Sequence, residues 1–375
     1  MRHLIDYLLA EVSQMYFDDK DFSQKVRFQK ILWAMGCWSR IEIPIVIYED
    51  DNKNERLQKH YLTDIDVYGE VIQPDFSVTK SIGDCKSGKN IKVFERLFWV
   101  RGVKEYLNAE LAYLIKRSIS SKAKIFMPKV GVKGVDDQIL AELENIFHSE
   151  HLMLFSKKYY EARAEIIGQL VDEYKKIYDY MNTRYWFTDS NVSMRVLMTM
   201  LKKREFYNSF DKHNKMHSFL LLEICIMLAR TLMDCCRYVM SRDVINVEIS
   251  VMEYIHGGID GYNNKMQMVR EISIPIKEIL GTEEVANKIL VKPYYYDELL
   301  KIIIILIGES SYARDVIRYM ELMQHEVLLD TSIDYTQIIG LQYSSVGHKL
   351  AKDIIAFYLR TNKIDGHFFD DIFLK

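Results

Sequence analysis

The sequence predicts a mixed α+β or α/β domain followed by an all-helical domain, on three observations. Isoleucines alternate with other residues along positions 38–48, and two more extended stretches follow at 62–72 and 81–85, as in half-buried strands. Beyond residue 150, apolar residues recur with the period of helices. The chain has 375 residues, 49% of them hydrophobic, which suffices for two cores. We therefore expect domains over residues 1–150 and 151–375.

Two amphipathic helices are expected before the first strand. Apolar side chains recur at helical spacing over residues 1–17 and again over Phe22–Met35, and Gly36 is well placed to end the second helix. Trp38–Tyr48 follows as a strand, and a polar loop then leads into the next pair of strands.

The stretch from Tyr61 to Gly88 predicts a β-hairpin. Its two extended segments flank residues 73–77, which are rich in turn-forming types. If the bend is centred near the middle of this turn, paired positions sum to about 150. Asp66 then lies opposite Asp84, on the same face of the hairpin.

The same register places Asp64 opposite Lys86 on that face. Opposed side chains lie roughly 4.5–5.5 Å apart at their Cβ atoms. Carboxylates this close repel one another unless a cation lies between them. Hard oxygen ligands of this kind suit Mg²⁺ or Mn²⁺. The pattern therefore predicts a divalent metal site with a lysine beside it.

The other interpretation of these residues is a solvated hairpin face with ordinary charges. Ile65, Val67 and Ile82 argue against it, because they make the sheet half-buried. Like charges that face each other there without an ion would destabilise the strand pair.

Asp66, followed by Asp84-Cys85-Lys86 on the next strand, resembles the motif of the PD-(D/E)xK nuclease superfamily. The resemblance implies a restriction-endonuclease-like αβα core. It also implies that Asp66 and Asp84 bind Mg²⁺ or Mn²⁺, that the Cys85 carbonyl assists them, and that Lys86 is catalytic. Asp75, in the literal "PD" sequence, falls at the hairpin tip and would lie tens of ångströms from Asp84, at about 3.3 Å per residue. We therefore prefer Asp66.

One position departs from the family pattern. Many members carry a Glu on the helix before the first strand, about three turns before its closing Gly, where this chain has Gln24-Lys25-Val26. Gln24 could stand in as an accessory ligand, as could Asp64, and Glu11 could reach in from the preceding helix. The missing carboxylate weakens the case for a second metal ion.

Three further elements are expected before residue 150: a long helix over Glu95–Arg117, a strand over Ala123–Val130, and a helix over Val135–His148 that begins at Asp136 or Asp137. Residues 80–133 include thirteen Lys or Arg but only four acidic residues, an excess of positive charge that suits phosphate binding. We expect DNA contacts from Lys89, Arg96 and Arg101. The alternative is a solvated charged face.

Composition indicates a cytoplasmic protein. The five cysteines show no paired spacing and are expected to be reduced thiols. Asp6 and Glu11 interrupt the apolar residues at the N-terminus, which argues against a signal peptide. The longest apolar runs are too short to span a bilayer, so we expect no membrane segment.

Beyond residue 150 the sequence predicts helices over residues 152–182, 192–207, 215–241, 244–256, 264–280, 283–291, 294–308, 311–328 and 345–361. The expected function is a metal-dependent endonuclease acting on DNA, with RNA as another substrate, in the manner of a bacterial defence or restriction effector. The helical domain would recognise substrate, bind a regulatory protein or form a homo-oligomer. The alternative is a catalytically inactive module that binds nucleic acid or protein.

Overall fold

The computed structural model describes residues 20–51, 56–86, 88, 92–202, 206, 209–280 and 292–373. The chain forms two compact units. The first comprises Met1–Gln73, Val78–Trp186 and Leu322–Tyr343, and the second comprises Pro74–Ser77, Phe187–Glu321 and Ser344–Lys375. The domain boundary predicted near residue 150 therefore lies within the first unit.

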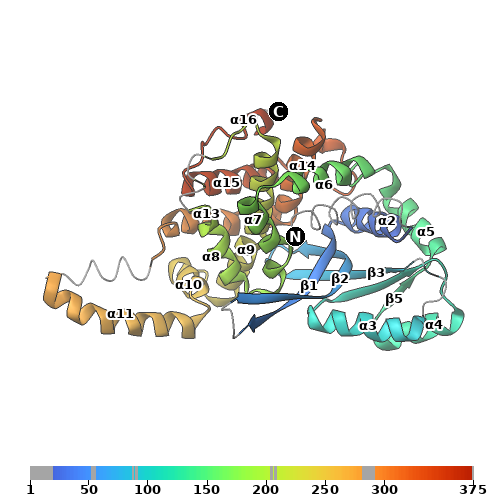
Figure 1. Cartoon of the computed structure of the whole chain (residues 1–375), viewed down its shortest axis with the longest axis horizontal. Coiled ribbons are helices and arrows are strands. Elements are labelled where there is room, and N and C mark those ends of the chain that lie inside the picture. Colours follow the sequence, from blue (N-terminus) through green and yellow to red (C-terminus); the bar gives the residue numbers. More distant parts are fainter. Residues whose placement is uncertain are drawn as a thin grey trace. The chain divides into compact units, whose positions relative to one another are not determined.

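The first unit contains a five-stranded mixed sheet in the order β1-β2-β3-β4-β5 (Figure 1). The first three strands pair antiparallel, whereas β3, β4 and β5 pair parallel. The strands are β1 (Trp38–Asp51), β2 (Arg56–Ile72), β3 (Val78–Lys86), β4 (Leu111–Lys116) and β5 (Lys133–Val135). A mixed α/β architecture, as the sequence predicts, is confirmed at this level.

Helices cover both faces of the sheet (Figure 1). On one face, α2 (Lys20–Ala34) and α5 (Asp137–Phe147) pack on a core that includes Phe28, Ile31 and Leu32. On the other face lie α3 (Val93–Tyr106) and α4 (Ser121–Phe126). After α2 ends, Gly36 has a φ of 92°, which a glycine adopts without steric cost and which fits the predicted helix stop.

Two predicted elements between the hairpin and α5 are wrong. The helix expected over Glu95–Arg117 ends at Tyr106, and its second half is instead strand β4. β4 is buried on both faces, so its sequence is a continuous apolar run without alternation and does not differ in pattern from a buried helix. The strand expected over Ala123–Val130 is instead α4 and the 3₁₀ turn η1 (Met127–Val130).

The start of α4 shows why that second segment is helical. The Ser120 side chain accepts a hydrogen bond from the backbone N–H of Ala123, which satisfies one of the first free amide groups of the helix. α5 begins in the same way, since Asp136 accepts from the N–H of Ile139. The predicted start of α5 is therefore confirmed.

None of the described residues beyond 150 lies in a strand, so the predicted helical character of this part is confirmed. The α-helices are α6 (Lys157–Gln169), α7 (Asp172–Asn182), α8 (Ser190–Thr199), α9 (Lys215–Arg242), α10 (Val247–Ile255), α11 (Ile259–Leu280), α13 (Tyr296–Gly308), α14 (Val316–Leu329), α15 (Ser345–Thr361) and α16 (Asp370–Phe373). Short 3₁₀ turns are η2 (Ser149–His151), η3 (Arg184–Phe187), η4 (Met200–Lys202), η6 (Ser310–Asp315) and η7 (Tyr335–Gln337). The helices expected over residues 1–17 and 283–291 lie outside the described residues.

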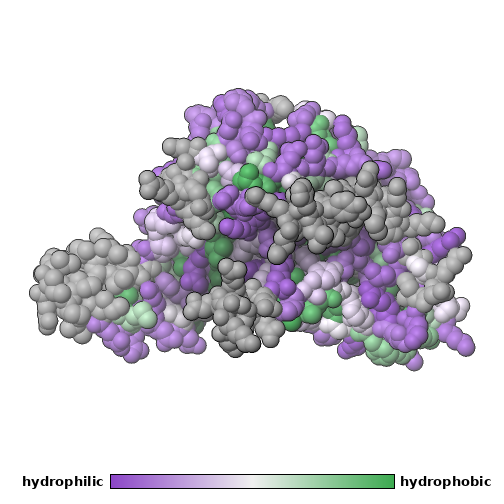
Figure 2. All heavy atoms as spheres, viewed as in Figure 1, coloured by the Kyte–Doolittle hydropathy of each residue, from purple (hydrophilic) through white to green (hydrophobic). Residues whose placement is uncertain are grey.

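The surface and the helix lengths bear on the membrane prediction. Most coloured atoms on the face drawn in Figure 2 belong to hydrophilic residues, and the apolar atoms form separate small patches. Within the described part of the chain, no helix combines the length and the apolar character needed to cross a bilayer. All five cysteines are buried and free of disulfides.

Candidate metal-dependent active site

The register of the β2–β3 hairpin brings the predicted residues together. The six pairs from Val67↔Gly83 to Ile72↔Val78 all sum to the predicted 150. Beyond Val67 the two strands separate, because β2 continues along β1 whereas β3 continues along β4 as far as Lys86. Asp66 and Asp84 are the first residues past the last pair. They therefore lie at the point where the sheet opens between its antiparallel and parallel halves.

Asp66 replaces a missing backbone partner at this opening. Its Oδ2 accepts a hydrogen bond of 2.8 Å from the backbone N–H of Cys85, a residue of β3 that lies past the last β2–β3 pair. In a strand, the N–H and C=O of one residue point to the same side, since a bonded antiparallel pair exchanges both bonds. The Cys85 carbonyl therefore faces the same opening as the Asp66 carboxylate. Its thiol side is fully buried in the core.

Lys86 lies between the two aspartates. Its Nζ is 3.1 Å from Oδ2 of Asp66 and 3.9 Å from Oδ1 of Asp84. The side chains of Asp66 and Asp84 are only 2% and 3% exposed, whereas the Lys86 side chain keeps 24% of its surface in contact with solvent. The three residues predicted as catalytic thus share one location, and the lysine is the most accessible of them.

Arg96 from α3 also enters this location. Its Nε donates to Oδ2 of Asp84 at 2.7 Å, its Nη2 pairs with Oδ1, and its guanidinium stacks over the Trp99 ring at 3.7 Å. Arg96, expected to contact DNA phosphate, therefore holds a site carboxylate in this structure. Arg101 lies on the exposed side of α3, 3.6 Å from Glu105. Lys89 lies outside the described residues.

The helix α2 contributes Lys25 to the site rather than Gln24. Gln24 donates from Nε2 to Asp137 at 3.3 Å, on the side of α5. Lys25 Nζ lies 2.8 Å from Oδ1 of Asp66 and 3.8 Å from Oδ2 of Asp64, so it is Lys25 that reaches the acidic residues from this helix.

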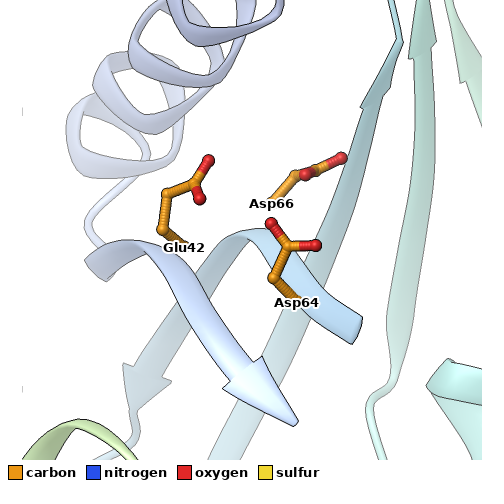
Figure 3. Close-up of side chains that lie close together, drawn as sticks. All are labelled: Glu42, Asp64 and Asp66. Carbon is orange, nitrogen blue, oxygen red and sulfur yellow. The ribbon is translucent and has the colours of Figure 1, made fainter. Parts of the chain in front are cut away.

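Glu42 completes an acidic group that the sequence prediction did not include. It comes from β1, pairs with Lys25, and lies beside Asp64 and Asp66 (Figure 3). One carboxylate oxygen from each of these three acids lies within 4.8 Å of the others. The backbone of Glu42 has a φ of 59°, a left-handed conformation that costs about 1–2 kcal/mol in a residue other than glycine. Strain of this kind is concentrated at functional sites.

Asp66 and Asp84 are equally buried but have opposite pKa shifts. Burial alone would raise the pKa of Asp66, yet Lys25, Lys86 and the Cys85 N–H outweigh it and lower that pKa below its ordinary value. Burial raises the pKa of Asp84, and the Arg96 guanidinium only partly offsets the rise. The surroundings therefore favour the ionised form of Asp66 more strongly than that of Asp84.

Two signals point to Lys25 and Glu42 once the fold is known. Lys25 lies three and seven residues before Phe28 and Leu32, on the buried stripe of α2, where a lysine is rarely found without an anionic partner. The β1–β2 pairs Ile41↔Val67 and Ile43↔Ile65 bracket the place where Glu42 faces Asp66. Both signals depend on knowing how the helix and strand pack.

The residues at the opening fit a divalent ion. Asp66 and Asp84 offer hard carboxylate oxygens, and the Cys85 carbonyl faces the same space. The Lys86 ammonium within 4 Å of both aspartates already stands where positive charge is needed. Each carboxylate has about four lone-pair positions. Asp66 uses three of them for Cys85, Lys86 and Lys25, and Asp84 uses two for Arg96, so each keeps lone pairs for a metal.

Comparison of the chain with protein-family models, with curated proteins and with solved structures finds no match. The chemistry of the site therefore rests on its own geometry.

Proposed function

We propose that the first unit is a metal-dependent endonuclease that hydrolyses phosphodiester bonds of DNA, built on a restriction-endonuclease-like core. One observation carries the proposal. Asp66, Asp84 and Lys86 come together where β2 and β3 separate, in the register that the motif requires. Helices on both faces of the mixed sheet are consistent with the αβα layering of that superfamily.

Asp66, Asp84 and the Cys85 carbonyl would hold the Mg²⁺ or Mn²⁺. When bound, the ion supplies Lewis acidity, which draws electrons from the scissile phosphate and makes water near it more acidic. In the hydrolysis, a water oxygen bonds to phosphorus and the bond from phosphorus to one sugar oxygen breaks. The leaving oxygen gains a proton, and the water loses one.

Lys86 is the residue that would act directly on the reacting groups. Its ammonium is partly exposed and carries three N–H donors. It would orient the attacking water or stabilise the negative charge that develops on the phosphate oxygens. Asp66, which accepts from Cys85 and lies beside Lys86, would hold the ammonium in place.

The helices beyond residue 150 would recognise the substrate, bind a regulatory protein or join a second copy of the chain. By analogy of fold, the role that suits this division of labour is a defence or restriction effector whose activity such a partner controls.

The test is cleavage of plasmid, linear and single-stranded DNA, with RNA beside them, in Mg²⁺, Mn²⁺ or EDTA. Wild-type protein should cut in metal and not in EDTA. Asp84→Ala should remove the activity, whereas Asp75→Ala at the exposed turn should keep it. Equal cutting by wild type and Asp84→Ala would overturn the proposal.

A second candidate is a binding module of the same fold without catalysis. One observation favours it: Asp66, Asp84 and Glu42 already have cationic partners from within the chain. In that case DNA binding, followed by electrophoretic mobility shift, would be the same for wild type and Asp84→Ala, with no cleavage in any metal. Mn²⁺ binding that disappears in Asp84→Ala would argue for the enzyme instead.

A further inference from the structure

Asp66 has two distinct sides, each with its own cation. Its Oδ2 faces the opening, where it bonds to the Cys85 N–H and lies near Lys86. Its Oδ1 faces the other way and lies 2.8 Å from the Lys25 ammonium. The carboxylate is thus placed to bridge two positions of positive charge, one shared with Asp84 and one shared with Glu42 and Asp64.

The Lys25 ammonium fills the second of these positions. It contacts Asp66 and Glu42 and lies 3.8 Å from Asp64, the three acids whose oxygens come within 4.8 Å of one another. The Lys25 side chain is only 10% exposed. It reaches the acids from α2, and the buried residues Phe28 and Leu32 on the same stripe anchor this helix on the sheet. A buried ammonium held in this way stands where a second divalent ion would otherwise bind.

The charge of the site favours one divalent ion beside Lys25. Four carboxylates (Glu42, Asp64, Asp66 and Asp84) face three cations (Lys25, Lys86 and Arg96), which leaves one net negative charge. One divalent ion reverses this to one net positive charge, which suits a phosphodiester anion. A second divalent ion beside Lys25 would add two more like charges next to an ammonium that cannot leave its buried position without losing its partners.

We infer that Lys25 serves as a built-in cation at the Glu42–Asp64–Asp66 position, so that the site takes a single divalent ion at Asp66 and Asp84. This inference rests on the proposed function for the Asp66–Asp84 position only. Lys25 is a positioning residue: its ammonium, 2.8 Å from Oδ1 of Asp66, holds that carboxylate in place without touching the substrate. Removing its charge would open a second metal position, which a purely structural lysine would not do.

The test is the number of Mn²⁺ ions bound by the full chain, measured by calorimetry. Wild type should bind one ion and Lys25→Met two, while Lys25→Arg and the exposed control Lys92→Met should bind one. The double variant Lys25→Met/Asp84→Ala should bind one ion, at the position that Lys25 leaves. If Lys25→Met folds only with Mn²⁺ present, the metal content of the desalted protein gives the same count.

The outcomes separate the two proposals. Two ions in wild type, or one in folded Lys25→Met when wild type also binds one, would overturn the role of Lys25. If wild type binds no ion and Lys25→Met binds one, the role of Lys25 is supported. The same result would refute the metal site of the proposed nuclease. No ion in either protein would remove both.

Discussion

The two ends of the β2–β3 hairpin carry aspartates in opposite surroundings. At the turn, the exposed Asp75 accepts hydrogen bonds from N and Oγ of Ser77, at 3.0 and 2.7 Å. At the open end, Asp66 and Asp84 are buried and pair with groups from α2, α3 and β3. Neighbours in sequence satisfy the first aspartate, whereas the other two depend on tertiary partners. Only the open end therefore brings two buried carboxylates together with cations from other elements.

The largest difference between the two ends should be in metal affinity. Asp66→Ala should weaken Mn²⁺ binding by more than about 100-fold, because even partners outside the ligand shell contribute 10–100-fold. Asp75→Ala should leave the affinity unchanged, since that carboxylate bonds within its own turn. Calorimetric titration of both variants measures this. Similar affinities would mean that the open end is not a metal site.

The next largest difference should be in kcat, between variants of a lysine at the open end and of a lysine in the paired part of the hairpin. Lys86→Ala should lower kcat by about 100-fold, as expected for the loss of one charge-stabilising donor, with Mn²⁺ binding retained. Lys80, in the paired part of β3, directs its Nζ to the Leu107 carbonyl, so Lys80→Ala should keep kcat. Single-turnover cleavage at saturating metal compares them. An equal loss in both would indicate a general electrostatic effect on DNA binding.

Packing beside the open end should give a smaller effect, on stability. A Cβ on Gly83 would come within 2.9 Å of the buried Phe28 ring and 3.1 Å of Ile115, so Gly83→Ala should lower the free energy of unfolding by about 1–3 kcal/mol. Nothing lies within 4 Å of a Cβ on Gly102 of α3, so Gly102→Ala should raise it by about 0.5–1 kcal/mol. Urea denaturation of both variants gives the signs, and a stable Gly83→Ala would contradict the close packing of α2 on β3.

The smallest expected effect concerns how stability changes with pH in EDTA. The pKa of Asp66 is lowered, so its ionised form adds stability that is lost as pH falls through that pKa. The pKa of Asp84 is raised, so stability is lost as pH rises from the unfolded value, near 3.9, through the folded one. Asp66→Asn should reduce the gain in stability with rising pH below about 3.9. Asp84→Asn should remove the loss of stability with rising pH above about 3.9. The same pH profile for both variants would show that the two carboxylates share one environment.

The sequence alone predicts the open end of the hairpin well. The turn formers at 73–77 set the register, and the register places Asp66, Asp84 and Lys86 together without knowledge of any other element. The boundaries of α5, α9 and α15 also follow closely from capping residues and helical period. Information of this kind is local, so one sequence suffices.

The partners of the carboxylates could not be predicted in the same way. Lys25 meets Asp66 only because α2 packs across the sheet, and Arg96 meets Asp84 only because α3 packs on its other face. The sequence prediction missed strand β4 for a related reason. Its burial between two helical layers removes the alternation of apolar and polar residues that marks a strand. These failures concern contacts between distant segments, which a periodic pattern does not encode.

Because Cys85 is fully buried, the rate at which its sulfur reacts would report how often β3 separates from its neighbours. Burial, with Asp66 and Asp84 nearby, raises the pKa of the thiol well above its ordinary value, so the reactive thiolate is scarce in the folded state. A disulfide reagent would therefore modify Cys85 only when the strand separates from its neighbours. In a variant that keeps Cys85 as the sole cysteine, the labelling rate would report the frequency of that local opening. Its slowing by Mn²⁺ would then record how firmly an ion closes the gap between β2 and β3.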